Sequence, residues 1–485
     1  MLFNSFTYLL FLPLVVLLYW TIPSRFRSWL LLIASYVFYM NWIPVYGLLI
    51  VGLTIVNYCL GLAISRFSRA RKQILTLGLV FNIGSLCWFK YANFLIDSLW
   101  QSIHWLGQIG ATQQSLPAPV LNILLPLGIS FFTFEFIHYI TDVYKGSPPI
   151  QNFKDFALFA AFFPSQIAGP IKRFQDFSKQ MEHSVSFNES YFRTGIFLIL
   201  QGLYKKIVLG DNLGTLINYG FTHTTELGTI DAWLAAAGFT FQIFFDFSGY
   251  TDIGRGSALL LGYKVPENFN WPFIAANLTD FWRRWHMSLS TWLRDYLFIP
   301  MGGSRGTPWA VRRNIFLTMV LGGLWHGAAW HYVIWGAFHG LGLVASKEWH
   351  DFVSRFEHLS KLRETKWWHY SGVGLTLIFL FIAGILFRAE QLSDVGTIME
   401  RMCSLTKSSE LTRLFWQSTV PISLLGYIVF LFFRTKSGPF TESVNKLRQW
   451  WDTSLSFRLV TCTSVALIIL GFAPGKIAPF IYFQF

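Results

Sequence analysis

Long uncharged apolar stretches dominate the chain. They fall at 6–22, 45–65, 73–89, 119–134, 314–346, 371–387 and 459–475. Since about 18–20 consecutive apolar residues let a helix cross a bilayer, each stretch is close to or beyond a spanning length. With the shorter apolar runs between them, the pattern predicts roughly ten to twelve membrane helices. We therefore expect an all-α, polytopic integral membrane protein.

The polar connections between these stretches are too short to hold a soluble domain. They lie at 107–118, 145–153, 301–312, 347–368, 389–413 and 434–455. We expect a single membrane domain over 1–485. In it, N-terminal helices (1–125) and C-terminal helices (371–485) flank a core at 126–346 that carries the motifs described below.

Composition narrows the class further. Only 13% of the residues are charged and 53% are hydrophobic, whereas a soluble protein carries about 25% charged residues. This excludes a cytosolic enzyme, a disordered chain and a secreted disulfide scaffold. The net charge of +13 comes from residues that flank apolar runs, so we expect a lipid bilayer around the protein and no nucleic-acid partner.

The placement of charge predicts the orientation. Residues 1–96 contain no Asp or Glu, whereas Arg25 and Arg27 follow the first apolar run and 66–72 is a basic segment. The positive-inside rule places both loops in the cytoplasm and the N-terminus outside it. Lys90 is an exception to this parity. The first apolar run lacks a basic start and a small-residue cleavage site, so we expect a retained helix.

Residues 277–300 combine helical spacing with charge. Asn277 and Asp280 resemble a capping box, and apolar residues recur at helical intervals from Leu278 to Tyr296. This predicts one helix, with another face formed by Arg283, Met287, Ser290 and Arg294. Because an arginine at the bilayer centre costs about 2.5–3.5 kcal/mol, we expect this helix at an interface or beside a polar cavity.

Residues 314–346 are uncharged and too long for one span: a helix of 33 residues would measure about 50 Å, against a hydrocarbon core of about 30 Å. Gly322 and Gly323 predict the break. His326 follows it, and an ionisable residue inside a membrane is by default a functional hypothesis. For His331 and His339, packing is the simpler interpretation.

The histidine chemistry points to proton transfer rather than to a metal. A neutral imidazole, with a pKa near about 6.5, can accept a proton from a hydroxyl group at neutral pH. The spacing of His326, His331 and His339 matches no zinc pattern, and no carboxylate lies between residues 296 and 347. We expect no metal site.

Other polar residues in the second half allow two interpretations. Arg283, Arg284, Arg294 and Arg305 anchor the protein at the interface or bind a phosphate-bearing donor through bidentate contacts. The indole N–H groups of Trp325, Trp330 and Trp335 are equal candidates for holding an oxyanion. Asp246, Asp252, Asn277 and Asp280 either support a polar core or form ordinary helix-interface hydrogen bonds.

Several segments, taken together and in order, resemble one known family. They are PLGISFFTFEFIHYITDVYKG (126–146), FFPSQIAGPIKRF (162–174), GLYKKIVLGDNL (202–213), QIFFDFSGYTDIGRG (242–256), NFNWPFIAANLTDFWRRWHMSLSTWLRDYLFIPMGG (268–303) and GGLWHGAAWHYVIWGAFHG (322–340). They cover about a quarter of the chain. The sequence resembles the membrane-bound O-acyltransferases, in the branch of bacterial alginate O-acetyltransferase.

The resemblance implies roles for particular residues. His326, in WHGA, matches the catalytic histidine of the family, and His286, in RRWHMSLS, matches its second histidine. The fold implied is a ring of membrane helices with re-entrant or interfacial helices around a central tunnel or funnel. His331 and the segment 135–138 depart from the family pattern, which leaves the subfamily and the acceptor open.

The resemblance also implies the reaction. Acetyl-CoA would serve as the acyl-donor substrate, without a permanently bound cofactor. The acetyl group would cross the bacterial inner membrane to an exported polysaccharide such as alginate, through periplasmic acetyltransferase partners. D-alanyl transfer to teichoic acid, and acetylation of cellulose or peptidoglycan, are alternatives within the class. An alternative from another class is a transporter or channel, for which inverted repeats would be the support.

Overall fold

The computed structural model describes residues 1–107, 118–167, 169–182, 185–407, 410–434, 441–474 and 478–481. All regular secondary structure in these residues is helical, as the apolar pattern predicts. Four helical segments among them are long and apolar enough to cross a membrane: Val45–Arg66, Arg71–His104, Lys366–Arg388 and Leu455–Phe472. The chain is thus an all-α protein with several apolar spans.

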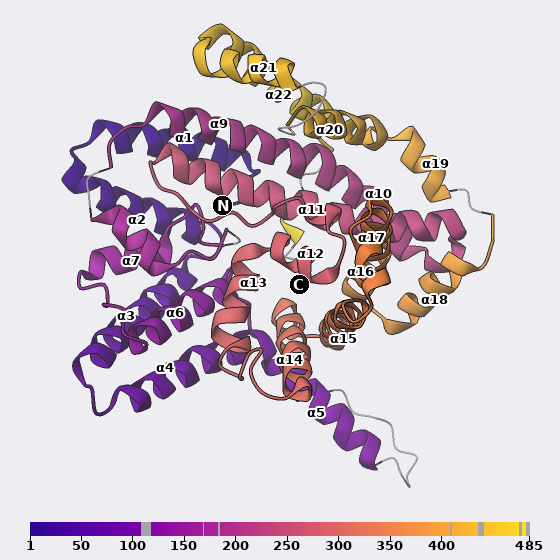
Figure 1. Ribbon diagram of the computed structural model, residues 1–485. Helices are drawn as coiled ribbons and strands as arrows, with labels where there is room; N and C mark the ends of the chain where they lie inside the picture. Colours follow the sequence, from indigo (N-terminus) through magenta and orange to yellow (C-terminus); the bar gives the residue numbers. More distant parts are fainter. Residues whose placement is uncertain are drawn as a thin grey trace.

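Most of the first helices form one side of the molecule, and α5 projects away from them past α14 (Pro308–His326) (Figure 1). They are α1 (Phe6–Thr21), α2 (Ser24–Met40), α3 (Val45–Arg66), α4 (Arg71–Leu86), the π-helical η1 (Cys87–Tyr91), α5 (Ala92–Gly107), α6 (Ile129–Tyr144) and α7 (Phe153–Ala161). The Ser5 hydroxyl caps α1 by accepting from the Tyr8 amide at 3.2 Å. The π-helical turn η1 changes the register of side chains between α4 and α5, as such turns often do at functional positions.

Two long helices run side by side through the middle of the fold, α9 and α11 (Figure 1). The bounds in this region are α8 (Phe174–Met181), α9 (Glu189–Leu203), η2 (Tyr204–Asp211), α10 (Asn212–Thr222), η3 (Thr224–Glu226) and α11 (Thr229–Leu260). A buried ion cluster joins η2 to α11, in which the Lys206 ammonium lies 2.6 Å from both Asp211 and Asp246. Such pairing is what makes a buried charge tolerable.

The segment 478–481 lies in the interior beside this cluster. The backbone N–H of Ile481 donates to the Asp246 carboxylate at 2.7 Å, and the Lys206 ammonium donates to the Pro479 carbonyl at 3.3 Å. Near the other end of the chain, the Asn4 side-chain amide donates to the Ala478 carbonyl at 3.3 Å. The last described residues are therefore part of the core.

The region around 277–300 does not form the single helix that the apolar spacing of these residues predicts. It forms η4 (Pro272–Ile274), α12 (Leu278–Arg284), α13 (Met287–Leu293) and the π-helical η5 (Arg294–Phe298). The predicted cap is confirmed, since the Asn277 side chain accepts from the Asp280 amide at 2.8 Å. The continuous helix is wrong, because the chain turns at His286, whose φ is 42°.

A neighbouring extended segment explains this turn. The Met287 amide donates to the Asn268 carbonyl at 2.9 Å, and the Asn270 amide donates to the Arg284 carbonyl at 2.9 Å. The Asn268 side-chain oxygen also accepts from the Ser288 amide at 3.2 Å. These partners replace hydrogen bonds that a continuous helix would make, and satisfied backbone groups make the break stable.

The apolar run 314–346 is divided between two packed helices, α14 (Pro308–His326) and α15 (Trp330–Val353). The predicted break at Gly322 and Gly323 is wrong, because α14 continues through both and the chain becomes extended only at 327–329. A Cβ on Gly323 would lie 2.3 Å from the Tyr332 carbonyl, and one on Gly336 would lie 2.4 Å from the Met319 carbonyl. These glycines let α14 and α15 approach closely.

The C-terminal helices complete the fold. They are α16 (Glu357–Arg363), α17 (Lys366–Arg388), α18 (Leu392–Cys403), α19 (Glu410–Gln417), α20 (Val420–Arg434), α21 (Thr441–Thr453) and α22 (Leu455–Phe472). Helix α17 packs against both α11 and α15, whereas α20, α21 and α22 lie at one edge of the molecule (Figure 1). The centre of the fold is thus framed by α11, α14, α15 and α17.

Candidate active site

His326 is the last residue of α14 and is 6% exposed. Aromatic rings surround its imidazole, with centroid distances of 4.9 Å to Trp325, 5.0 Å to Trp335 and 5.2 Å to Phe387. Because α14 ends here and the following residues are small and extended, the ring lies at a helix end and is not covered by a further helical turn.

Two residues of η1 hold this helix end. The Lys90 ammonium donates to the carbonyls of Trp325 at 2.6 Å and His326 at 3.0 Å. The Tyr91 hydroxyl donates to the Leu324 carbonyl at 2.8 Å. The last carbonyls of a helix lack partners within the helix, and the negative end of its dipole favours a cation. The Lys90 ammonium supplies both the hydrogen-bond donor for these carbonyls and the positive charge.

In the sequence, Lys90 stands out only as an exception to the positive-inside pattern. Its contacts with α14 span more than 230 positions of the chain, so no local pattern predicts them. The available signal is that Lys90 is the only charged residue between 73 and 96. A lone cation in an apolar run needs a buried partner, which here is the end of α14.

His286 also lies beside Trp325. Its ring is 6.2 Å from the Trp325 ring and 4.6 Å from the Phe247 ring, and the residue is 1% exposed. Within the described residues, neither ring nitrogen of His286 has a hydrogen-bond partner, nor does the Trp325 indole N–H. Buried polar groups are normally satisfied, so unpaired ones are candidates for binding a ligand.

Two cavities border His326. One, of about 50 Å³, is lined by Trp282, Trp335 and His339 among others. The other, of about 120 Å³, is lined by Lys90, Ser130 and Trp325 among others. The imidazole can therefore be approached from two sides.

A larger cavity, of about 540 Å³, lies beside α12 and α13. The face predicted from the sequence lines it, with Arg283, Met287, Ser290 and Arg294 all present. It shares Trp282 with the smaller cavity at His326. We call it the arginine cavity, because Arg283 and Arg294 are the only charged residues that line it in the described part of the chain.

At the rim of the arginine cavity, Arg294 donates to the Asp295 carboxylate at 2.7 Å. Partial burial by itself raises the pKa of Asp295, but hydrogen bonds from Arg294 and Arg173 more than offset it, so this pKa lies below its usual value. Asp295 is therefore an anion at neutral pH and compensates part of the local positive charge.

Other predicted residues lie elsewhere. Arg284 pairs with Asp280 at 2.9 Å, and Arg305 lies in the exposed turn before α14. Trp330 is 57% exposed and packs on Phe94. None of these lines the arginine cavity or the two cavities at His326.

The predicted supporting carboxylates are structural partners of buried lysines. Asp246 pairs with Lys206 at 2.6 Å, and Asp252 pairs with Lys205 at 2.8 Å. Both carboxylates thus join α11 to η2. Asn277 and Asp280 serve the start of α12 instead of a polar core.

His339, for which packing was the simpler interpretation, lines the same cavity as His326. Its ring lies 4.4 Å from Trp335 and 5.2 Å from Trp282. His331 is only half-buried, with its ring 4.0 Å from Tyr332, and it lines neither cavity at His326. The spacing His326–His331–His339 does not reveal this difference, because the chain is extended between α14 and α15.

This geometry defines a class of protein: a multi-pass helical membrane protein with buried imidazoles beside internal cavities, suited to proton transfer during group transfer. Its residues 73–390 match the model of the membrane-bound O-acyltransferase family, MBOAT. The chain belongs to that family and is a membrane O-acyltransferase, so the transporter alternative is set aside.

Curated relatives resemble the chain over most of its length. It is 43% identical to a "Probable alginate O-acetylase AlgI" of Pseudomonas aeruginosa, over 89% of this chain and 81% of that protein. A "Peptidoglycan O-acetyltransferase" of Helicobacter pylori is 34% identical over 84% of this chain and 80% of its own length. A "Teichoic acid D-alanyltransferase" of Bacillus subtilis is 33% identical over 56% of this chain and 70% of its own.

Proposed function

We propose that this chain transfers an acetyl group from acetyl-CoA to a hydroxyl group, in the O-acetylation of an exported polysaccharide such as alginate. The single observation that carries the mechanism is the position of His326, buried at the end of α14 between two cavities. The similarity to a protein named as an alginate O-acetylase supports the acyl group and the polymer.

In the proposed reaction, His326 accepts the proton of the attacking hydroxyl group while that oxygen bonds to the thioester carbonyl carbon. N–H donors stabilise the oxyanion of the tetrahedral intermediate, and the unpaired indole N–H of Trp325 is our candidate. When the carbon–sulfur bond breaks, the imidazolium returns the proton to the leaving thiolate. The products are an ester and the free thiol of CoA, with no net gain or loss of protons.

The arginine cavity is our candidate for the donor. Arg283 and Arg294 provide guanidinium groups that suit phosphates, and Trp282 is shared with the smaller cavity at His326. We propose that phosphates of CoA bind near these arginines, with the thioester directed past Trp282. His286 is proposed as the second reactive-site histidine.

We place the protein as one domain in the bacterial inner membrane, with the N-terminus outside the cytoplasm. Arg25, Arg27 and the basic segment 66–72 support this orientation through the positive-inside rule. Lys90 does not weigh against it, because its ammonium is bonded to the end of α14 and is not a loop charge. The transferred acetyl group would then reach periplasmic acetyltransferase partners and the exported polymer.

Different acceptors fit the same chemistry. The similarity to a peptidoglycan O-acetyltransferase and to a teichoic acid D-alanyltransferase makes these polymers the second choice. Supplying candidate acceptors to one face of reconstituted vesicles, with labelled acetyl-CoA on the other, distinguishes them by the polymer that becomes labelled.

The mechanism is tested with purified protein in nanodiscs and acetyl-labelled CoA. Replacing His326 by Ala is expected to lower CoA release by about 10²–10⁴-fold, the usual contribution of a general base. His331→Ala is the matched control, since His331 lines neither cavity at His326, and we expect its activity to stay near that of wild type. Wild-type turnover by a folded His326→Ala protein would contradict the proposal.

A further inference from the structure

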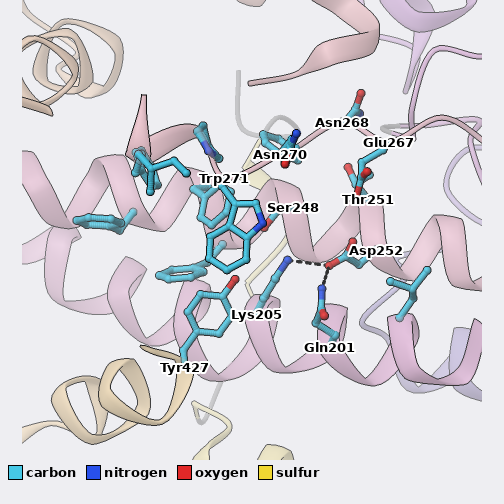
Figure 2. A pocket seen from close by; sticks show the side chains of 18 of the residues that line it. Gln201, Lys205, Ser248, Thr251, Asp252, Glu267, Asn268, Asn270, Trp271 and Tyr427 are labelled. Carbon is cyan, nitrogen blue, oxygen red and sulfur yellow. Dashed lines mark hydrogen bonds and ion pairs between the residues drawn. The ribbon is translucent and has the colours of Figure 1, made fainter. Parts of the chain in front are cut away.

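A fourth cavity, of about 480 Å³, lies away from His326, between α9, η2, α11, the loop 267–274 and α20. Figure 2 shows its lining: Lys205, Gln201, Asp252 and Thr251 are on one side, with Trp271 and Tyr427 toward the other. The volume is within the range of about 300–1,000 Å³ of ligand sites. It shares Phe273 with the smaller cavity at His326 but contains neither reactive-site histidine.

The charges in this cavity are balanced. The Asp252 carboxylate accepts hydrogen bonds from Lys205 at 2.8 Å and from Gln201 at 2.6 Å. Arg255 pairs with Glu267 at 3.1 Å. Two cations thus face two carboxylates, unlike the arginine cavity, so this cavity offers no excess positive charge to a polyphosphate.

Three buried polar groups in the lining have no hydrogen-bond partner in the described part of the chain: the Ser248 and Thr251 hydroxyls and the Asn268 side-chain N–H₂. Each of these residues is at most 2% exposed. All three can donate to a neutral oxygen, such as an ester carbonyl or a hydroxyl group. A buried donor left unpaired costs about 1–3 kcal/mol, which a ligand with such oxygens would recover.

Most of the remaining lining is apolar, and the cavity reaches the surface of the fold. Ile274 and Ile428 line it and are 51% and 53% exposed. Both are apolar residues on the surface of a membrane protein, which is the lining that a rim facing hydrocarbon requires. Trp271, also in the lining, has φ of 51°, a strained value for a bulky residue that is typical of ligand clamps.

We propose that this cavity binds one membrane lipid whose polar part is uncharged and rich in ester or hydroxyl oxygens. Its oxygens would accept hydrogen bonds from Ser248, Thr251 and Asn268, while an acyl chain would follow the aromatic lining toward Ile274 and Ile428. The acyl transfer proposed above assigns no role to a residue that lines this cavity, so this inference does not rest on that function.

The site is also linked to His286. Asn268 contributes its N–H₂ group to the cavity, while its carbonyl and side-chain oxygens accept from the amides of Met287 and Ser288. A lipid bonded to Asn268 therefore holds the turn that carries His286. Occupancy of the cavity would stabilise that turn.

The test uses the full chain in detergent, with dioleoylglycerol as the probe, phosphatidylglycerol as the anionic comparison and native mass spectrometry as the readout. We expect one dioleoylglycerol per wild-type chain. The double substitution Ser248→Ala, Thr251→Val should lower its retention at least tenfold, and Thr251→Val alone should lower it by a smaller factor. Ser290→Ala with Thr291→Val, two hydroxyls that line the arginine cavity, is the matched control and should retain the lipid.

Three results would overturn the inference. The first is no retention of dioleoylglycerol by folded wild-type protein. The second is equal retention by the Ser248→Ala, Thr251→Val variant. The third is preference for phosphatidylglycerol, or displacement of the lipid by free CoA, since either would show that the cavity selects anions. CoA release by wild type, measured separately, tells such a failure apart from a failure of the proposed acyl transfer.

Discussion

The rings of His326 and His286 lie 4.9 Å and 6.2 Å from the indole ring of Trp325, but the protein supports the two histidines differently. His326 ends a regular helix whose last carbonyls are bonded to Lys90 and Tyr91, and cavities border it on two sides. His286 occupies a left-handed turn and has no partner for either ring nitrogen among the described residues.

The difference separates two ways of placing an imidazole. At His326 the chain supplies a helix end held by hydrogen bonds, and two cavities through which a substrate can reach the imidazole. At His286 it tolerates strain, which for a non-glycine residue costs about 1–3 kcal/mol and persists mostly at functional sites. Unpaired ring nitrogens add to that cost. We infer that His286 needs substrate to complete its hydrogen bonds, whereas His326 is held in place by the protein alone.

In the comparison of the two histidines, the largest loss of activity without loss of stability should come from replacing His286 by Asn. Asparagine tolerates a left-handed backbone, so His286→Asn should fold with a free energy of unfolding within about 1 kcal/mol of wild type. The loss of the imidazole should lower CoA release about 10²-fold. Thermal unfolding and turnover are measured on the same preparation. A fall in melting temperature that accounts for the lost activity would contradict a functional role for this histidine.

Lys90 allows a second comparison, because its ammonium hydrogen-bonds to the end of the helix that carries His326. Lys90→Met keeps the length of the side chain but leaves the carbonyls of Trp325 and His326 without their donor. Losing a charged hydrogen bond of about 1.5–3 kcal/mol should lower kcat about 10–100-fold.

Because Lys90 bonds the protein backbone, the KM for acetyl-CoA should stay unchanged, and Lys90→Arg should restore part of kcat. Steady-state kinetics of the two variants make the measurement. If KM and kcat change together, or if arginine does not rescue, Lys90 is not a positioning residue for His326.

The smallest effect should be on the KM for acetyl-CoA, when the arginine cavity beside the histidines is changed. Arg283→Ala removes one guanidinium from the arginine cavity and should raise the KM for acetyl-CoA about 5–10-fold, the loss of about 1 kcal/mol. Arg305→Ala is the control, since Arg305 is exposed and lines none of the cavities described above. The effect of Arg283 should shrink with added salt. Equal KM values for the two variants would remove the arginine cavity as the donor site.

Much of the fold follows from local sequence. Apolar runs indicate the helices, and the side chain of Asn277 indicates where α12 begins, because caps act within a few residues. The positions at which helices break do not follow from local sequence. Gly322 and Gly323 have the composition of a helix break, but the close approach of α15 uses them inside a helix. At His286 the break depends on Asn268, whose backbone partner is distant in sequence.

The site shows the same division. The motif around His326 and the arginine face of 283–294 are recognisable because their residues are close in sequence. Lys90 and His339 join the site only through tertiary packing. Lys90 belongs to no motif, and His339 lies in the segment 322–340, but its spacing from His326 does not show that the two share a cavity. In such chains, a single charged residue in an apolar run and a histidine on an apolar helix indicate candidates for the site.

The interior position of 478–481 has a consequence for biosynthesis. A ribosome adds this segment after every helix named above, yet it supplies the backbone donor for Asp246 and an acceptor for Lys206. Until it arrives, these two charges in the centre of the protein lack those partners. We expect chains stopped before residue 478 to be recognised by membrane proteases as unfinished, so that the cell accumulates only molecules whose synthesis has passed this point.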